Sequence, residues 1–266
     1  MMKTKQLALL NFLSVTLAIA TSYFTQAFKL NGHTIGSLSK EPDYQNLFTP
    51  APYAFAIWGL IYLALIVMTS YQIYQVFYKK SDLNFLKKTK YWLISANLLT
   101  SLWVVAWLYE YTGLSVIFMF LALFSLLRII INTKMECWDA SLKTITFSWW
   151  PICFYAGWLT VASIANTAAF LTKMGFRDVI FSEQNWTIIM IVIATLINVG
   201  MVYYRNMREY AAIGVLALFA IYIKHQNADE TLAITALVCA IIVGLAISYH
   251  AFVNRRTLPG IRKFYE

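Results

Sequence analysis

Residues 53–78 read YAFAIWGLIYLALIVMTSYQIYQVFY, a run of 26 residues without a charged side chain. A helix needs about 20 mostly apolar residues to cross the hydrocarbon core of a bilayer. Seven more segments of this kind lie at residues 7–28, 91–110, 113–133, 144–172, 186–204, 209–224 and 231–253. The segment at 209–224 is the weakest, because its apolar centre has only 13 residues. The sequence therefore predicts an all-α protein, a polytopic bundle of about eight transmembrane helices.

The overall composition agrees with a membrane protein. Of the 266 residues, 60% are hydrophobic and 12% are charged, whereas about a quarter of the residues in a soluble domain are charged. The net charge of +9 does not indicate nucleic-acid binding, because the basic residues cluster in short loops and at the chain ends, without interleaved aromatic residues. Such clusters meet anionic lipid headgroups. Membrane lipids are the expected partners, and no nucleic acid is expected.

The basic residues also predict the orientation in the membrane. If the N-terminus is cytoplasmic, 15 of the 21 Lys and Arg residues face the cytoplasm and one, Arg128, lies inside the fourth segment. The five on the other side are Lys29, Lys40, Lys173, Arg177 and Lys224. Positive residues in short loops favour the cytoplasmic side, so we expect both termini in the cytoplasm and a bacterial inner (cytoplasmic) membrane. Alternatively, the first segment is a secretory signal cleaved near Ala18-Ile19-Ala20, which leaves the other seven helices in place.

The composition changes along the chain near residue 174. Eight of the nine tryptophans precede residue 160, and the segments after residue 174 are plain and aliphatic. This change predicts a five-helix unit over residues 1–173 and a three-helix unit over residues 174–266. The longest loop, residues 29–52, is rich in glycine and proline. A loop of this length is either a lid over a binding site or a plain connector.

Three of the predicted helices carry aromatic and polar residues at helical spacing. Trp58 and Tyr62 lie four apart in the second, and Thr100, Trp103 and Trp107 fall at i, i+3 and i+7 in the third. Trp158, Ala162 and Asn166 repeat every four residues in the fifth. Side chains at such spacings share one face of a helix. The three faces either pack helix against helix or converge on one aromatic cavity. In the second case the predicted ligand site consists of Trp58, Tyr62, Thr100, Trp103, Trp107, Trp158, Ala162 and Asn166.

No pattern in the sequence points to catalysis or to a metal site. The three cysteines and three histidines are scattered, without the spacing of a metal site or a disulfide framework. The tryptophan-rich segments supply neither a general base nor a nucleophile. We therefore expect a binding protein rather than an enzyme, with no cofactor of its own. A small-solute transporter, or a structural or assembly protein without a ligand, are the alternatives.

The stretch TPAPYAFAIWGLIY at residues 49–62 resembles the second-helix signature of the TspO/MBR family, the tryptophan-rich sensory proteins that include the mitochondrial translocator protein. In that family a proline and an aromatic residue precede a Trp-Gly-x-x-Tyr stretch, which Trp58, Gly59 and Tyr62 match. In the fifth segment, WLTVASIAN at residues 158–166 is similar to the family pattern Trp-x-x-x-Ala-x-x-x-Asn at all three marked positions.

The third segment resembles the family less closely. In the pattern Gln-x-x-x-Asn-x-x-Trp, Trp103 matches, Thr100 takes the place of Asn, and Asn97 is displaced by three residues. The family's paired prolines after this Trp are Val104 and Val105 here. The aromatic-then-basic stretch of sterol recognition is absent from the end of the fifth segment, which argues against a sterol ligand.

The resemblance covers the first five predicted helices. It implies a five-helix bundle whose pocket takes flat hydrophobic ligands, above all a tetrapyrrole such as a porphyrin or haem. The predicted site residues would line this pocket, the long loop would close it, and the role would be sensory, regulatory or transport-related. A homodimer is compatible with such a bundle. The last three helices have no counterpart in the standard five-helix form, which makes this chain a divergent member with a C-terminal extension.

Overall fold

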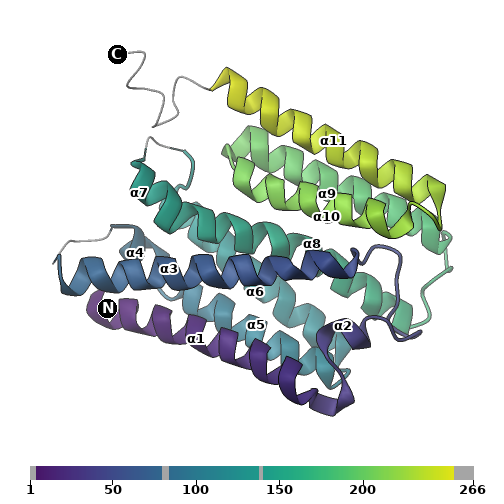
Figure 1. The fold of residues 1–266 in the computed structure, drawn as a ribbon, viewed down its shortest axis with the longest axis horizontal. Coiled ribbons are helices and arrows are strands. Elements are labelled where there is room, and N and C mark those ends of the chain that lie inside the picture. Colours follow the sequence, from purple (N-terminus) through teal and green to yellow (C-terminus); the bar gives the residue numbers. More distant parts are fainter. Residues whose placement is uncertain (1–3, 80–83, 138–139, 255–266) are drawn as a thin grey trace.

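The computed structural model describes residues 4–79, 84–137 and 140–254. In these ranges eight helices have 17 or more residues, and they run along one long axis (Figure 1). Each lies within a few residues of a predicted segment, so the predicted all-α bundle is confirmed. The eight are α1 (Thr4–Phe28), α3 (Ile57–Phe77), α5 (Trp92–Leu108), α6 (Thr112–Thr133), α8 (Trp150–Lys173), α9 (Glu183–Arg205), α10 (Arg208–His225) and α11 (Glu230–Val253).

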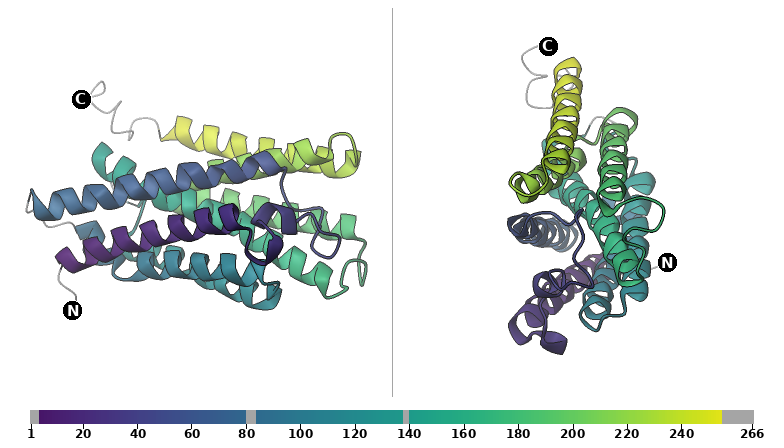
Figure 2. Two further views of the ribbon diagram at one scale, coloured as in Figure 1. Left: turned by 60° about the horizontal axis from the view of Figure 1, so that its bottom comes forward. Right: turned by 90° about the vertical axis from the view of Figure 1, so that its right-hand side faces the viewer.

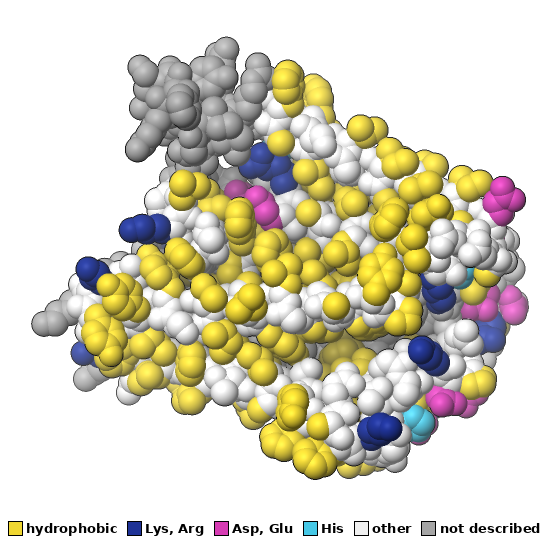
Figure 3. Space-filling view, viewed as in Figure 1, with side chains coloured by type: hydrophobic (Ala, Val, Ile, Leu, Met, Phe, Trp, Pro, Cys, Tyr) yellow, Lys and Arg dark blue, Asp and Glu magenta, His cyan; other side chains and the backbone are white. Residues whose placement is uncertain are grey.

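Most of these helices are suited to a lipid environment. Six of the described helical segments are long and apolar enough to cross a membrane. Of the other two, α5 has only 17 residues, and α10 has 18 but carries three charged residues, Arg208, Glu209 and Lys224. Hydrophobic side chains cover the middle of the visible face, and most charged side chains lie toward its two ends (Figure 3). This distribution is that of an integral membrane protein.

Short helical elements lie at the two ends of the bundle, and polar or proline residues fix where helices begin. Ser182 caps α9 and Asp229 caps α11, each accepting a hydrogen bond from a backbone N–H of the first turn. Pro52 begins a 3-10 turn, as expected for a residue with a fixed φ. The short elements are η1 (Leu30–Gly32), α2 (Ile35–Leu38), η2 (Pro52–Ala56), α4 (Asn84–Thr89), α7 (Leu142–Thr144) and the π-helical turn η3 (Ile145–Trp149).

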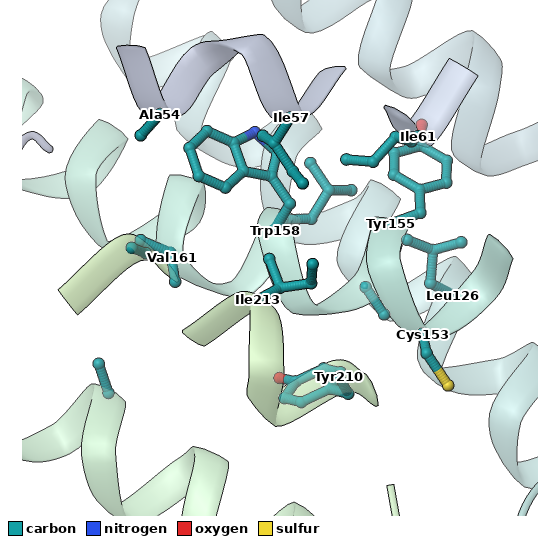
Figure 4. Close-up of a cluster of buried hydrophobic side chains, with 14 of the residues drawn as sticks. Ala54, Ile57, Ile61, Leu126, Cys153, Tyr155, Trp158, Val161, Tyr210 and Ile213 are labelled. Atoms are coloured by element: carbon teal, nitrogen blue, oxygen red, sulfur yellow. The ribbon is translucent and has the colours of Figure 1, made fainter. Parts of the chain in front are cut away.

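Helix α8 lies at the centre of the bundle, where it contacts α3, α6, α9 and α10. In its span, 72% of the most apolar 18 residues are buried, against 33–39% in the other five candidate spans. Small residues on α8 let its neighbours approach closely. A Cβ atom added at Gly157 would stand 2.6 Å from the carbonyl oxygen of Tyr210 in α10. Figure 4 shows α8 between the beginning of α3 and α10.

One hydrophobic core continues through both predicted units. It includes Val15 of α1, Trp158 of α8 and Val243 of α11. The division at residue 173 falls at the end of α8 and stays a prediction. Helix α10 of the second predicted unit packs extensively on α8 of the first. The beginning of α1 and the end of α11 lie at the same end of the bundle, and α2 lies at the opposite end (Figures 1 and 2).

Candidate functional site

Residues 29–51, which we call the lid, fold back over the bundle end where α1 finishes and α3 begins. The lid has a hydrophobic underside, because Leu38, Tyr44 and Phe48 are only 1–3% exposed. These side chains belong to the same core as the membrane-spanning helices. Of the two interpretations of the long loop, its packing favours a lid over a plain connector.

A cavity of about 50 Å³ lies beneath the lid, between α3, α5 and α8. The lid contributes one wall, to which Asn46, Thr49 and Pro50 belong. The structure brings six of the eight predicted site residues to this cavity, and their role in binding a ligand stays a prediction. These six are Trp58, Trp103, Trp107, Trp158, Ala162 and Asn166.

The aromatic rings around the cavity pack in preferred geometries. Trp58 stacks on Trp103, with ring centroids 6.5 Å apart and planes 22° from parallel. Phe55 meets Trp158 edge to face, with centroids 5.8 Å apart. Stacked and edge-to-face pairs each stabilise by about 0.5–1.5 kcal/mol beyond the buried area. The wall is therefore a connected aromatic surface that can hold its shape around a ligand.

The two other predicted residues support this wall rather than line it. Tyr62 stacks on Trp58 at 5.3 Å between ring centroids. The hydroxyl oxygen of Thr100 lies 2.6 Å from that of Tyr155, whose ring in turn meets Trp58 edge to face at 6.0 Å. Sequence reasoning placed both in the lining, because helical spacing gives the face of a helix but not the depth of a side chain.

The helical part of the cavity lining includes the amide of Asn166 and the indole N–H groups of its tryptophans. Asn166 donates through Nδ2 to the hydroxyl of Ser115 in α6 at 3.1 Å. The indole N–H groups of Trp103 and Trp158 are buried and have no hydrogen-bond partner among the described residues. Buried indole N–H groups usually find an acceptor. Both nitrogens are enclosed by protein atoms, so an acceptor atom of a ligand would reach these donors only when the surrounding side chains move.

A much larger open space of about 970 Å³, which we call the vestibule, adjoins the cavity. Phe55, Trp58, Thr49 and Pro50 line both spaces. The vestibule is bounded by the end of α1, the lid, the beginning of α3 and Lys224 of α10. In the face shown in Figure 3 the surface is hollowed between the α2 region and the beginning of α3.

One end of the lid is held by a group of polar residues at the ends of α5 and α8. The Tyr44 hydroxyl donates to the carboxylate of Glu110, and its ring meets Trp107 edge to face at 5.6 Å. Lys173 donates to the Tyr44 hydroxyl at 2.8 Å. Burial, reinforced by the Glu110 carboxylate, raises the pKa of Tyr44. The hydrogen bond from Tyr44 in turn holds the pKa of Glu110 below its usual value.

A second cavity, of about 200 Å³, lies between the end of α8 and the beginning of α9. Its apolar wall includes Phe176, Ile180 and Trp186, the one tryptophan after residue 160. Arg177 and Glu183, which form an ion pair at 3.5 Å, also line it. Asn46 of the lid lines both this space and the tryptophan cavity.

Several lining residues were not among those predicted from the sequence. Phe55 lies within the stretch that resembles the family signature, so that stretch could have indicated it. Thr49 begins the same stretch, whereas Asn46 could not have been found, because nothing in its spacing shows where a loop folds back. In the described part of the chain, no group of three or more His, Cys, Asp and Glu residues is placed to hold a metal ion.

Comparison with known proteins assigns the family. The sequence pattern of a family described as TSPO-like protein matches residues 8–249. Neither a curated protein nor a solved structure matches the chain. The family match runs through α9, α10 and α11, so the three helices that the five-helix form lacks are within the matched region. This chain belongs to the TSPO-like protein family.

Proposed function

We propose that this integral membrane protein binds a flat hydrophobic molecule of the porphyrin or haem type, in a sensory, regulatory or transport-related role. One observation carries the proposal: tryptophans from three helices meet under the lid, around a cavity that adjoins the vestibule and shares six lining residues with it. An aromatic wall with a few polar groups is typical of sites for small apolar ligands.

The sizes of the two spaces support a specific binding mode. Ligand sites usually measure about 300–1,000 Å³, so the cavity of about 50 Å³ is too small on its own and the vestibule of about 970 Å³ is large enough. The ligand would lie mainly in the vestibule, with its flat face on Phe55 and Trp58. One edge would reach toward Trp103 and Trp158, whose N–H groups could bind its acceptor atoms when the surrounding side chains move.

The chemistry of this site favours binding over catalysis. The polar side chains that line the cavity are serine, threonine and asparagine, and the others are apolar or aromatic. Hydroxyl and amide groups orient a ligand by hydrogen bonding, and a hydroxyl needs an adjacent base to act as a nucleophile. The proposed role is therefore that of a binding protein rather than an enzyme.

Titration of the purified protein with protoporphyrin IX tests this function. We expect saturable quenching of tryptophan fluorescence, weakened in Trp58→Phe and Trp158→Phe because each loses indole surface at the site. Trp92→Phe is the matched control, since Trp92 lies away from the cavity and packs on Phe124 at 5.8 Å. The absence of saturation, or equal quenching in cavity and control variants, would contradict the proposal.

We also propose that both termini lie in the cytoplasm of a bacterial inner membrane, with the lid on the outer side. The charge distribution and the even number of long helices support this orientation. In a Cys137→Ser background, a membrane-impermeant maleimide should label Lys40→Cys in intact cells but not Lys88→Cys. Both positions are exposed, so labelling of Lys88→Cys but not of Lys40→Cys would indicate the opposite orientation.

A further inference from the structure

The end of α10 holds the second half of the lid. Lys224 donates through Nζ to the backbone carbonyl of Asn46 at 2.8 Å and to that of Thr49 at 2.9 Å. Nε2 of the neighbouring His225 lies 2.8 Å from the carbonyl oxygen of Leu47. A carbonyl only accepts, so this histidine nitrogen carries the proton.

A backbone contact completes the attachment. The N–H of Ala51 donates to the carbonyl oxygen of Ala220, one turn before Lys224, at 3.2 Å. Residues 46–51 are thus bonded to a single stretch of α10. The same residues include Asn46, Thr49 and Pro50, which form the lid wall of the tryptophan cavity.

We propose that Lys224, assisted by His225, is a positioning residue that latches the lid to α10, so that the helices after α8 control how far the tryptophan cavity opens. Where it concerns ligand binding, the inference rests on the proposed function. Lys224 also lines the vestibule. Release of its bonds to the lid carbonyls would therefore move the wall that the cavity and the vestibule share.

The other half of the lid is held separately. Lys173 binds Tyr44, and Arg177 donates to the carbonyls of Pro42 and Gln45 at 3.1 and 2.9 Å. Three of the five basic residues predicted to lie outside the cytoplasm therefore bind the lid. This role explains why basic residues persist on the side that the charge rule disfavours. It also means that loss of Lys224 should release residues 46–51 without detaching residues 42–45.

Hydrogen exchange of the ligand-free protein tests the latch directly. In Lys224→Met we expect amide exchange in peptides covering residues 46–51 to rise at least about tenfold, because charge-assisted hydrogen bonds are lost. Exchange around residues 42–45 should change little. Lys224→Arg should restore protection, because arginine can donate to the same carbonyls. Lys40→Met is the matched control: Lys40 lines the vestibule, and its ammonium has no hydrogen bond to a described residue.

Unchanged exchange over residues 46–51 in Lys224→Met would overturn the latch. If that variant does not fold, His225→Leu provides the second test, because leucine has no N–H to donate to the carbonyl of Leu47. We then expect faster exchange over the same peptides, and wild-type protection would count against the proposal.

Stopped-flow mixing with protoporphyrin IX tests the consequence for the ligand. In Lys224→Met both association and dissociation should become faster by at least about tenfold, with a smaller change in Kd, because a gate changes both rates. A purely structural role would weaken Kd without a faster association rate. If the wild-type protein binds no porphyrin, the proposed function fails, while the exchange measurement still decides whether the latch exists.

Discussion

The close approach of α8 to the backbone of α10 makes Gly157→Ala an informative substitution. An added Cβ atom would stand 2.6 Å from the carbonyl oxygen of Tyr210 and 3.1 Å from the Cβ atom of Ile213. An ordinary contact between carbon and a carbonyl oxygen is about 3.3 Å, so α8 and α10 would have to separate by about 0.7 Å. Backbone atoms cannot turn aside as side chains do, and the strain must spread along both helices.

The expected cost follows from packing data on other cores. Overpacking of this kind destabilises by about 1–3 kcal/mol, while replacing glycine by alanine within a helix is favourable by up to about 1 kcal/mol. Gly244→Ala in α11 is the matched control, because nothing lies within 4 Å of the added Cβ atom there. Compared with this control, Gly157→Ala should be less stable by about 1–3 kcal/mol.

Thermal unfolding of both variants in the same detergent measures this difference. A protein of this size should lose about 2–4 °C of Tm per kcal/mol. If Gly157→Ala unfolds at the same temperature as Gly244→Ala, α8 and α10 are not packed as closely as described. That result would also weaken the argument for the latch, because the packing of α10 on α8 positions the end of α10 beside the lid.

Three further substitutions have defined outcomes. Burial, with a contribution from Glu209, raises the pKa of Glu136 to about 8. The stability linked to this group is present below pH 4.5 and is lost as the pH rises through about 8. Tm should therefore fall over this range, and Glu136→Gln should flatten the dependence of Tm on pH. The pKa of Glu110 is lowered, so its contribution to stability is present above pH 4.5 and is lost as the pH falls below that value. Glu110→Gln should abolish this loss of Tm in acid. At neutral pH it should also speed amide exchange near Tyr44. Asn166→Leu should cost only about 0.6 kcal/mol for its interhelical hydrogen bond but weaken porphyrin binding, because it fills the cavity toward which one edge of the ligand reaches. An unchanged affinity in the quenching titration would exclude Asn166 from the site.

The helices could be predicted from the sequence because each has to satisfy one strong requirement. Within the membrane, the backbone N–H and C=O groups of an uncharged run such as residues 53–78 must all be hydrogen-bonded. A helix meets this requirement without help from distant residues. The faces of α3, α5 and α8 followed from the same regularity, which is why six of the eight predicted site residues meet at one cavity.

The lid contacts could not be predicted, because they join residues far apart in the chain through backbone atoms. Lys224 and Asn46 are 178 positions apart, and a carbonyl acceptor leaves no trace in the sequence. Tyr62 and Thr100 were placed one layer too close to the cavity for a related reason. Their helical faces were right, but Tyr155, which bonds to Thr100, had no pattern to indicate it.

Because Lys224 and His225 bind main-chain oxygens of the lid, the latch does not depend on which side chains the lid carries. Every amino acid, proline included, supplies a carbonyl group. Over evolution, residues 46–49 could exchange side chains to suit a different ligand while the closing mechanism stayed intact. Closure and ligand preference can therefore diverge independently in this fold, and a library of lid sequences on an unchanged α10 would be a practical route to new binding specificities.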